Sequence, residues 1–166
     1  VLMKDLNDSE FQSFLEFAAA KPVSVRFIEL MPTADNKEFF KKRHLSAQGL
    51  LGKLGEEGWQ EVPRKEGDGP ARVFGRAGQR GTIGLIAPYS KDFCATCNRL
   101  RVTSRGGLRL CLFAESDFSI RHLLQSDDQI EELQQAVRDL LNRKEISHYL
   151  PEGRFGNTKH FAMMGG

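Results

Sequence analysis

Val23-Ser-Val-Arg-Phe-Ile-Glu-Leu-Met31 is followed directly by Pro32, and this stretch decides the fold that the sequence predicts. The run is almost continuously apolar, which is typical of a strand buried on both faces, and a proline is well placed to end it. Residues 9–20 precede it, open with the capping-box pattern Ser9-Glu10-Phe11-Gln12 and carry apolar side chains at helical spacing. A helix followed by a buried strand indicates an α/β unit.

The remainder of the chain predicts further helices and a set of short strands. Ser46 is a good N-cap for a helix over residues 47–54. Ser119 is expected to cap a short helix, and the capping box that begins at Ser126 a longer one. Between these helices we expect an antiparallel sheet, because turn sequences separate five strand candidates, which are residues 59–63, 71–74, 81–87, 100–103 and 108–113.

Composition narrows the classes of protein that fit. The 24 basic and 22 acidic side chains give a net charge of +2, so attraction to phosphate must come from local clusters of charge. No apolar run approaches the roughly 18 residues of a membrane span, and no signal peptide is evident, so we expect a cytoplasmic protein without a membrane partner. The three cysteines are an odd number, which favours metal ligands or reactive thiols over a disulfide framework.

The cysteines lie close together as Cys94-x2-Cys97-x13-Cys111. A C-x2-C turn lets two sulfurs converge on one metal or cluster, and the glycine turn near Arg105 predicts a hairpin that returns Cys111 toward them. If residues near 104 and 108 pair, Cys111 lies opposite Arg101, and Cys97 is four strand positions further away, roughly 13 Å at 3.3 Å per residue. A cluster of several atoms spans this gap more readily than a single ion.

Alternation along a strand would place Arg99 and Arg101 on the same side as Cys97 and leave Leu100 on the other. Two guanidinium groups beside a metal ligand suit a substrate that carries phosphate. Arg105 and Arg109, by contrast, are expected to be solvated or to steer phosphates without binding them specifically.

The spacing alone does not choose between an iron-sulfur cluster and other uses of three cysteines. Structural zinc normally takes four ligands, and the histidines that could complete such a site are His122 and the more distant His44. Three unrelated thiols buried for packing are a further alternative.

Two segments around the cysteines resemble a known family. They are Tyr89-Ser-Lys-Asp-Phe-Cys94-Ala-Thr-Cys97-Asn-Arg99-Leu-Arg101-Val-Thr and Gly107-Leu-Arg-Leu-Cys111-Leu-Phe. Both closely resemble the C-terminal cluster region of the molybdenum cofactor biosynthesis protein A family, radical S-adenosylmethionine enzymes that act as GTP 3',8-cyclase. The strand from Arg26 to Pro32 and the terminal Gly165-Gly166 are similar to the same family, in the same order.

The resemblance implies an α+β chain: the last helix and strand of an incomplete α/β (TIM-like) barrel, then a C-terminal region with an antiparallel sheet and helices. By this interpretation residues 1–35 end the barrel, residues 36–147 bind the cluster and GTP, and residues 148–166 form a tail.

The same resemblance implies roles for single residues. Cys94, Cys97 and Cys111 would bind a [4Fe-4S] cluster whose open iron holds the guanine base. Arg99, Leu100, Arg101 and Arg26 would contact GTP, and Met31 would lie at the S-adenosylmethionine site. Gly165 and Gly166 would form the end of the tail that enters the catalytic site. Without the resemblance, Arg26 could equally be a core arginine, Met31 a packing residue and the two glycines a flexible end.

The implied activity is conversion of GTP to 3',8-cyclo-7,8-dihydro-GTP in molybdenum cofactor (molybdopterin) biosynthesis. Cyclic pyranopterin monophosphate synthase would be the next enzyme of the pathway, and a homodimer of the full-length protein is compatible with the resemblance. The family's C-x3-C-x2-C motif for the radical-generating cluster is absent from these residues. We therefore expect this chain to be the C-terminal portion of the cyclase and to be inactive alone.

Two other functions are compatible with a cysteine hairpin. One is a zinc-hairpin module that binds nucleic acid, against which the near-neutral net charge argues. The other is the auxiliary-cluster domain of a different radical enzyme that acts on a peptide.

Overall fold

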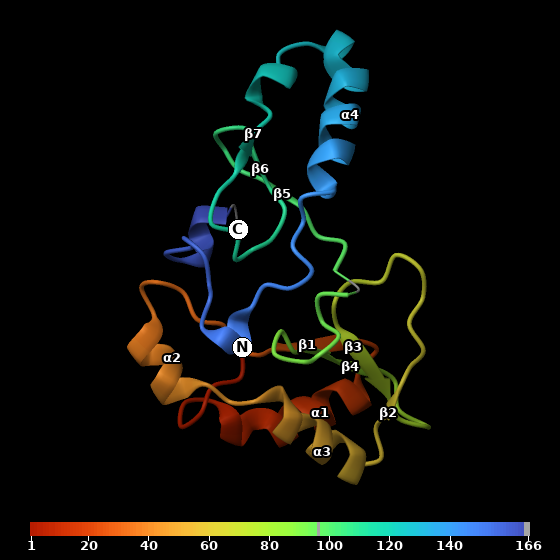
Figure 1. Ribbon diagram of the computed structural model, residues 1–166. Helices are drawn as coiled ribbons and strands as arrows, with labels where there is room; N and C mark the ends of the chain where they lie inside the picture. The colour runs from red at the N-terminus through yellow and green to blue at the C-terminus, as the bar shows by residue number, and fades with distance from the viewer. Residues whose placement is uncertain (96, 165–166) are drawn as a thin grey trace. The chain divides into compact units, whose positions relative to one another are not determined.

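The computed structural model describes residues 1–95 and 97–164, and the chain divides into two compact units (Figure 1). The first comprises Val1–Met31 and Lys37–Thr96, and the second comprises Pro32–Asn36 and Cys97–Gly166. Each combines helices with a β-sheet, so the predicted α+β class is confirmed. Among the described residues, no helix combines the length and the apolar content that a bilayer crossing needs.

The first unit contains a mixed four-stranded sheet in the order β1-β4-β3-β2. Its strands are β1 (Ser24–Ile28), β2 (Gln60–Glu61), β3 (Arg72–Gly75) and β4 (Thr82–Ile86). The pairs β2–β3 and β3–β4 are antiparallel, as predicted, whereas β1 and β4 are parallel. The chain between β1 and β4 passes through two helices and then through β2 and β3, which gives the long connection that a parallel pair needs.

Helices α1 (Phe11–Ala20) and α3 (Ala47–Glu56) lie on the same side of this sheet (Figure 1). Their buried residues form one core with β1 and β4, and its members include Phe11, Leu54, Phe27 and Ile83. Within the unit, β1 is covered on one face only, because Phe27 is buried while Ser24 and Arg26 are exposed. The prediction of a strand buried on both faces is therefore wrong for this unit.

The helix starts of the first unit fit the sequence prediction only in part. Ser46 caps α3 as expected, and its hydroxyl oxygen accepts a hydrogen bond from the Gln48 amide at 3.2 Å. Ser9 is not a cap: it lies inside a 3-10 turn, η1 (Asp8–Glu10), whose N-cap position is Asn7. A further short helix, α2 (Lys37–Arg43), precedes α3 in the chain.

A carboxylate is buried immediately beyond β1. Only 2% of the Glu29 side chain is exposed, and its Oε1 lies 2.9 Å from Nε2 of His44. The His44 ring contacts both Phe40 and Tyr89, with ring centroids 4.6 and 5.4 Å away, and these two rings also stack on each other at 6.2 Å. Burial raises the pKa of the Tyr89 phenol to about 12, and the negative charge of Glu29 adds to this rise.

The second unit contains a three-stranded antiparallel sheet in the order β5-β6-β7. Its strands are β5 (Arg101–Val102), β6 (Gly107–Arg109) and β7 (Phe118–Ser119). Short 3-10 turns surround the sheet; they are η2 (Arg121–Leu123), η3 (Asp127–Gln129), η4 (Leu150–Glu152) and η5 (Phe161–Met164). Ser119 belongs to β7 and does not cap the turn after it, so that prediction is wrong.

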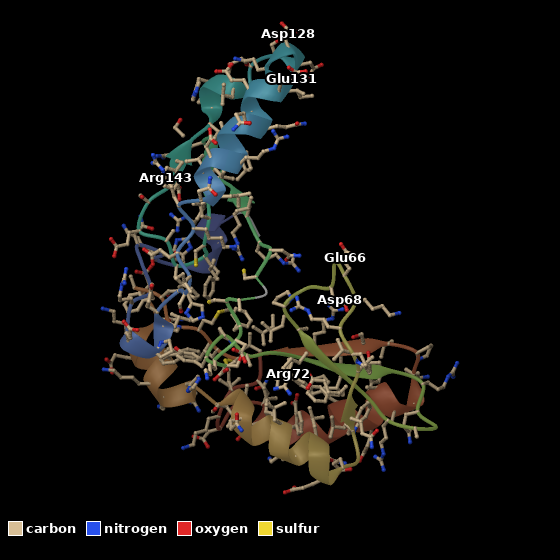
Figure 2. The ribbon with its side chains drawn as sticks, turned by 45° about the vertical axis from the view of Figure 1, so that its right-hand side comes forward. Glu66, Asp68, Arg72, Asp128, Glu131 and Arg143 are labelled. Atoms are coloured by element: carbon tan, nitrogen blue, oxygen red, sulfur yellow. The ribbon has the colours of Figure 1, made fainter. Side chains whose placement is uncertain are left out.

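Helix α4 (Ile130–Leu141) packs against the sheet of the second unit through Leu133, Val137 and Leu140. The predicted capping box at Ser126 is present in full, with Gln129 as its second member. Figure 2 shows Asp128 and Glu131 at the start of the helix and Arg143 beyond its end. Acidic groups at the start and basic groups at the end both interact favourably with the helix dipole.

A buried arginine joins the sheet of the second unit to the C-terminal segment. Arg109 is 4% exposed, and its guanidinium donates to Asp117 Oδ1, Thr158 Oγ1 and Asn157 Oδ1. The Thr158 hydroxyl in turn donates to the Leu112 carbonyl at 2.7 Å. The expectation that Arg109 is a solvated charge is wrong, because the residue is buried. Two of its three partners lie 48 and 49 residues ahead and could not be read from the hairpin.

Backbone contacts also attach the C-terminal segment to the rest of the second unit. Gly156 has φ +61, and a Cβ there would collide with the carbonyl oxygens of Phe113 and Ala114. The Ala34 amide donates to the Thr158 carbonyl at 3.1 Å. Residues 156–159, the C-terminal strap, are thus held against the turn that follows Cys111.

We expect Arg109→Met to lower the free energy of unfolding by about 3 kcal/mol, because it leaves the Asp117 carboxylate, the buried Thr158 hydroxyl and the exposed Asn157 amide oxygen without their donor. Arg105→Met is the matched control, since Arg105 is exposed in the hairpin turn and should change stability by no more than about 0.5 kcal/mol. Chemical denaturation followed by circular dichroism measures both changes. Equal losses in the two variants would contradict the structural role of Arg109.

We expect Tyr89 to ionise near pH 12 in the folded chain, against its ordinary value of 10.0. Tyr149→Phe leaves Tyr89 as the only tyrosine, so absorbance of the phenolate reports it alone. Because the folded state keeps the proton to higher pH than the unfolded state, stability should fall as pH rises from 10.0 to about 12. Glu29→Gln should lower the midpoint only in part, since burial is the larger cause, and a midpoint near 10 in the folded chain would disprove this account.

Candidate metal centre

Cys94 lies in the first unit, in a series of turns that follow β4. The Ser90 amide donates to the Ala87 carbonyl at 3.0 Å, and the Phe93 amide donates to the Ser90 carbonyl at 3.2 Å. These turns end the strand and leave the thiol of Cys94 partly exposed.

Cys97 opens the second unit and begins a segment without regular secondary structure that runs to Leu100. Leu100 packs against the core of this unit, while the side chain of Arg99 is exposed. The predicted alternation applies to β5 only, which starts at Arg101. Arg101 is half-buried, and Val102, expected on the same side as Leu100, is 56% exposed.

The hairpin that follows has a register two residues away from the expected one. Arg101 pairs with Arg109, so the same register continued past the strand would set Cys111 across from Arg99. The shift arises at the turn, where Thr103 and Gly107 close the loop through a hydrogen bond of 2.8 Å. Gly106 takes φ +74, which glycine adopts without steric cost. Counted in this register, Cys97 lies two positions along the chain from the residue that faces Cys111, and not four as predicted.

Cys111 leads into a turn that shapes the surroundings of its sulfur. The Ala114 amide donates to the Cys111 carbonyl at 3.2 Å, and the Phe113 amide lies 3.5 Å from Cys111 Sγ in donor geometry. Cys111 also lines a pocket of about 240 Å³ in the second unit, together with Arg143, Arg154 and Glu145. Cys111 therefore borders a pocket whose walls are both apolar and charged.

The structure divides the cysteine triad between the two units, with Cys94 in the first and the other two in the second. None of the three forms a disulfide, and all are partly exposed. Within residues 1–95 and 97–164, no three His, Cys, Asp or Glu side chains gather as a metal-binding group. By its chemistry the donor set fits an iron-sulfur cluster, since cysteine thiolates are the usual ligands and amide donors to sulfur tune such clusters.

The histidines considered as zinc ligands have other positions. His44 lies in the first unit against Glu29, at 2.9 Å, and His122 is exposed in η2. A structural zinc site normally requires four ligands. The described side chains therefore give no support to a histidine-completed zinc site.

A lysine contacts the segment that begins at Cys97. The Lys144 ammonium donates to the Cys97 carbonyl at 2.9 Å and to the Arg99 carbonyl at 3.4 Å, and it lies 3.9 Å from Cys97 Sγ. Sequence reasoning missed Lys144, because 47 residues separate it from Cys97 and no motif links the two.

The remaining predicted site residues lie as follows. Arg26 is exposed on β1, where it is paired in register with Gly84, and a Cβ at that glycine would be 2.8 Å from Arg26 Cγ. The glycine thus makes room for the arginine stem. Met31 is half-buried at the end of the first segment of the first unit. Gly165 and Gly166 lie outside the described residues.

Comparisons with known proteins agree with these motifs. The family profile described as Molybdenum Cofactor Synthesis C matches residues 23–150. The chain is also 45% identical over all its 166 residues to a GTP 3',8-cyclase of Yersinia pestis, of which it covers 51%. It is 48% identical to the GTP 3',8-cyclases of Stenotrophomonas maltophilia and Haemophilus influenzae, of which it covers 51% and 49%.

The chain thus spans about half the length of the curated relatives it matches. The profile match includes all three cysteines and both arginines of the Cys97–Arg101 segment. Since it extends over well more than half of the chain, the chain belongs to the Molybdenum Cofactor Synthesis C family.

Proposed function

We propose that this chain forms part of a GTP 3',8-cyclase, the enzyme that converts GTP to 3',8-cyclo-7,8-dihydro-GTP in molybdenum cofactor biosynthesis. The observation that carries the proposal is the similarity, at 45–48% identity over the whole chain, to proteins that bear this name. The proposed contribution of these residues is capture and orientation of the substrate.

Cys94, Cys97 and Cys111 are the proposed ligands of a [4Fe-4S] cluster. Such a cluster, when bound through three cysteines, supplies an open iron that can coordinate an atom of the guanine base. The residues around it contribute in their own right: the Phe113 amide is placed to donate to Cys111 Sγ, and the Lys144 ammonium lies beside Cys97 Sγ. Hydrogen bonds to the sulfurs and nearby charge are what a protein uses to adjust such a site.

The same segment offers groups for the triphosphate. Arg99 is exposed and Arg101 half-buried, and the packing of Leu100 against the core of the second unit fixes the backbone between them. Guanidinium groups form bidentate hydrogen bonds with phosphate oxygens. Arg26, exposed on the first unit's sheet, is proposed to bind phosphate as well. Holding the nucleotide at several points orients the ribose for reaction.

Further proposals concern the whole enzyme. Residues 1–35 would form the end of an incomplete α/β barrel, with Met31 at the site of S-adenosylmethionine. Residues 36–147 would bind the cluster and GTP, and residues 148–166 would form a tail whose Gly165 and Gly166 enter the catalytic site. The three cysteines suffice for one cluster, so the radical-generating chemistry would require a second set of ligands.

The cellular location, the next enzyme of the pathway and the oligomeric state follow from the same proposal. Reduced thiols and an iron-sulfur cluster fit the cytoplasm. The product would pass to cyclic pyranopterin monophosphate synthase, and the full-length enzyme would be the species that forms a homodimer.

Anaerobic reconstitution with iron and sulfide tests the metal centre. We expect about four iron atoms per chain and broad visible absorption, and Cys94→Ser, Cys97→Ser and Cys111→Ser should each reduce both sharply, because a three-cysteine site has no spare ligand. Ser104→Ala is the control, since Ser104 is exposed in the hairpin turn. Stoichiometric zinc without visible absorption would reject the cluster, and a cluster that the cysteine variants retain would reject these ligands.

Equilibrium binding of GTP to the reconstituted chain tests the arginines. Arg99→Met and Arg101→Met should each weaken binding on the order of tenfold to a hundredfold, because each removes charge-assisted hydrogen bonds to phosphate worth about 1.5–3 kcal/mol. The matched control is Arg105→Met on the same hairpin, which should bind GTP like the unchanged chain. If all three variants lose affinity equally, the loss reflects net charge alone and the assignment of Arg99 and Arg101 is wrong.

A further inference from the structure

Lys144 makes three contacts with one short segment of the second unit. Its ammonium donates to the carbonyl oxygens of Cys97 and Arg99, at 2.9 and 3.4 Å, and lies 3.9 Å from Cys97 Sγ. An ammonium has three N–H donors and no acceptor, so these contacts can use all of them. Two carbonyls that lie two residues apart are thereby turned toward the same point.

We infer that Lys144 is a positioning residue that fixes the conformation of the Cys97–Arg99 loop, and with it the direction of the Cys97 sulfur and of the Arg99 side chain. The role in the loop follows from the contacts above. Its meaning for the metal centre rests on the proposed function.

Lys144 is held in place by the end of helix α4. The Lys144 amide donates to the Leu141 carbonyl at 3.0 Å, so the chain continues the last turn of α4. The helix is held through Leu140 and other apolar residues that pack on the core of the second unit. The stem of Lys144 is half-buried, which restricts it further. The ammonium is therefore presented by a packed helix end and not by a mobile surface chain.

The loop depends on such support because it has little of its own. Residues 97–100 lie outside the sheet, and β5 begins only at Arg101. Leu100 fixes one end of the segment by packing on the core. Lys144 fixes the other end, at the Cys97 carbonyl. Between the two anchors the Arg99 side chain stays exposed.

The neighbouring positively charged side chains make other contacts. The guanidinium of Arg143 lies 5.5 Å from the centre of the Phe118 ring, and that of Arg138 donates to Gln134 and Gln135 within α4. Loss of charge at this end of the helix can thus be separated from loss of the specific contacts of Lys144. Arg138→Met is the matched control for Lys144→Met, because both remove one positive charge from the same region.

The first measurement uses the metal-free chain and does not depend on the proposed function. Hydrogen exchange of the peptide that spans residues 97–101 should be faster in Lys144→Met, on the order of tenfold, as expected for loss of charge-assisted hydrogen bonds. Lys144→Arg, which keeps the charge and donors, should restore part of the protection. The Arg138→Met chain should exchange like the unchanged protein. Equal exchange in all four chains would overturn the inference.

The second measurement uses the reconstituted chain. Removing a positive charge and a donor beside a cysteine sulfur should make the reduction potential more negative, and Lys144→Met should show this shift while Arg138→Met does not. An unchanged potential in a variant whose loop has loosened would overturn the role toward the Cys97 sulfur. If the loop loosens but no variant takes up iron, the role in the loop is supported and the proposed metal centre is the part that fails.

Discussion

The second unit depends on a single buried guanidinium. Arg109 brings together an aspartate that precedes β7 and two residues of the C-terminal strap, 48 and 49 residues ahead in the sequence. Taking an arginine out of water is costly unless its charge and its donors all find partners. Here Asp117 balances the charge and three of the five N–H donors find protein acceptors, and the consequence is that the strap covers the turn after Cys111. The surroundings of that cysteine therefore depend on residues near the end of the chain as much as on the hairpin that carries it.

Local signals in the sequence predicted local structure well. Ser46 and Ser126 each cap a helix as expected, because capping needs only a side-chain oxygen and the next few amides. Ser9 had the same pattern and failed, since the chain before it follows Asn7 into a 3-10 turn. Contacts across long distances were not predictable. The burial of Arg109 depends in part on partners 48 and 49 residues away, the contacts of Lys144 span 45 and 47 residues, and no periodicity encodes either set.

The candidate site shows the same difference between local features, which the sequence predicts, and geometry that the sequence does not determine. The cysteine spacing and the two arginines beside it were visible in the sequence, and the family match agrees with them. The hairpin register was predicted two residues away from the one observed, because it depends on which glycine takes the positive φ. A register is fixed by turn geometry, and Arg105-Gly106-Gly107 offers two glycines for the same role.

The register has a consequence for the chemistry of the hairpin. It sets Arg101 directly across from Arg109, and like charges in facing positions of two strands repel each other. Asp117 neutralises Arg109, whereas Arg101 forms no ion pair within the part of the chain that the structure describes. Arg109 is buried, its charge is balanced by Asp117, and three of its five N–H donors are bound to protein groups, so it offers little to a ligand. Arg101 retains both its charge and its donors, and an anion bound there would relieve the repulsion across the strands. Of the two facing arginines, half-buried Arg101 is therefore the one suited to hold a phosphate, whereas buried Arg109 serves the contacts within the second unit.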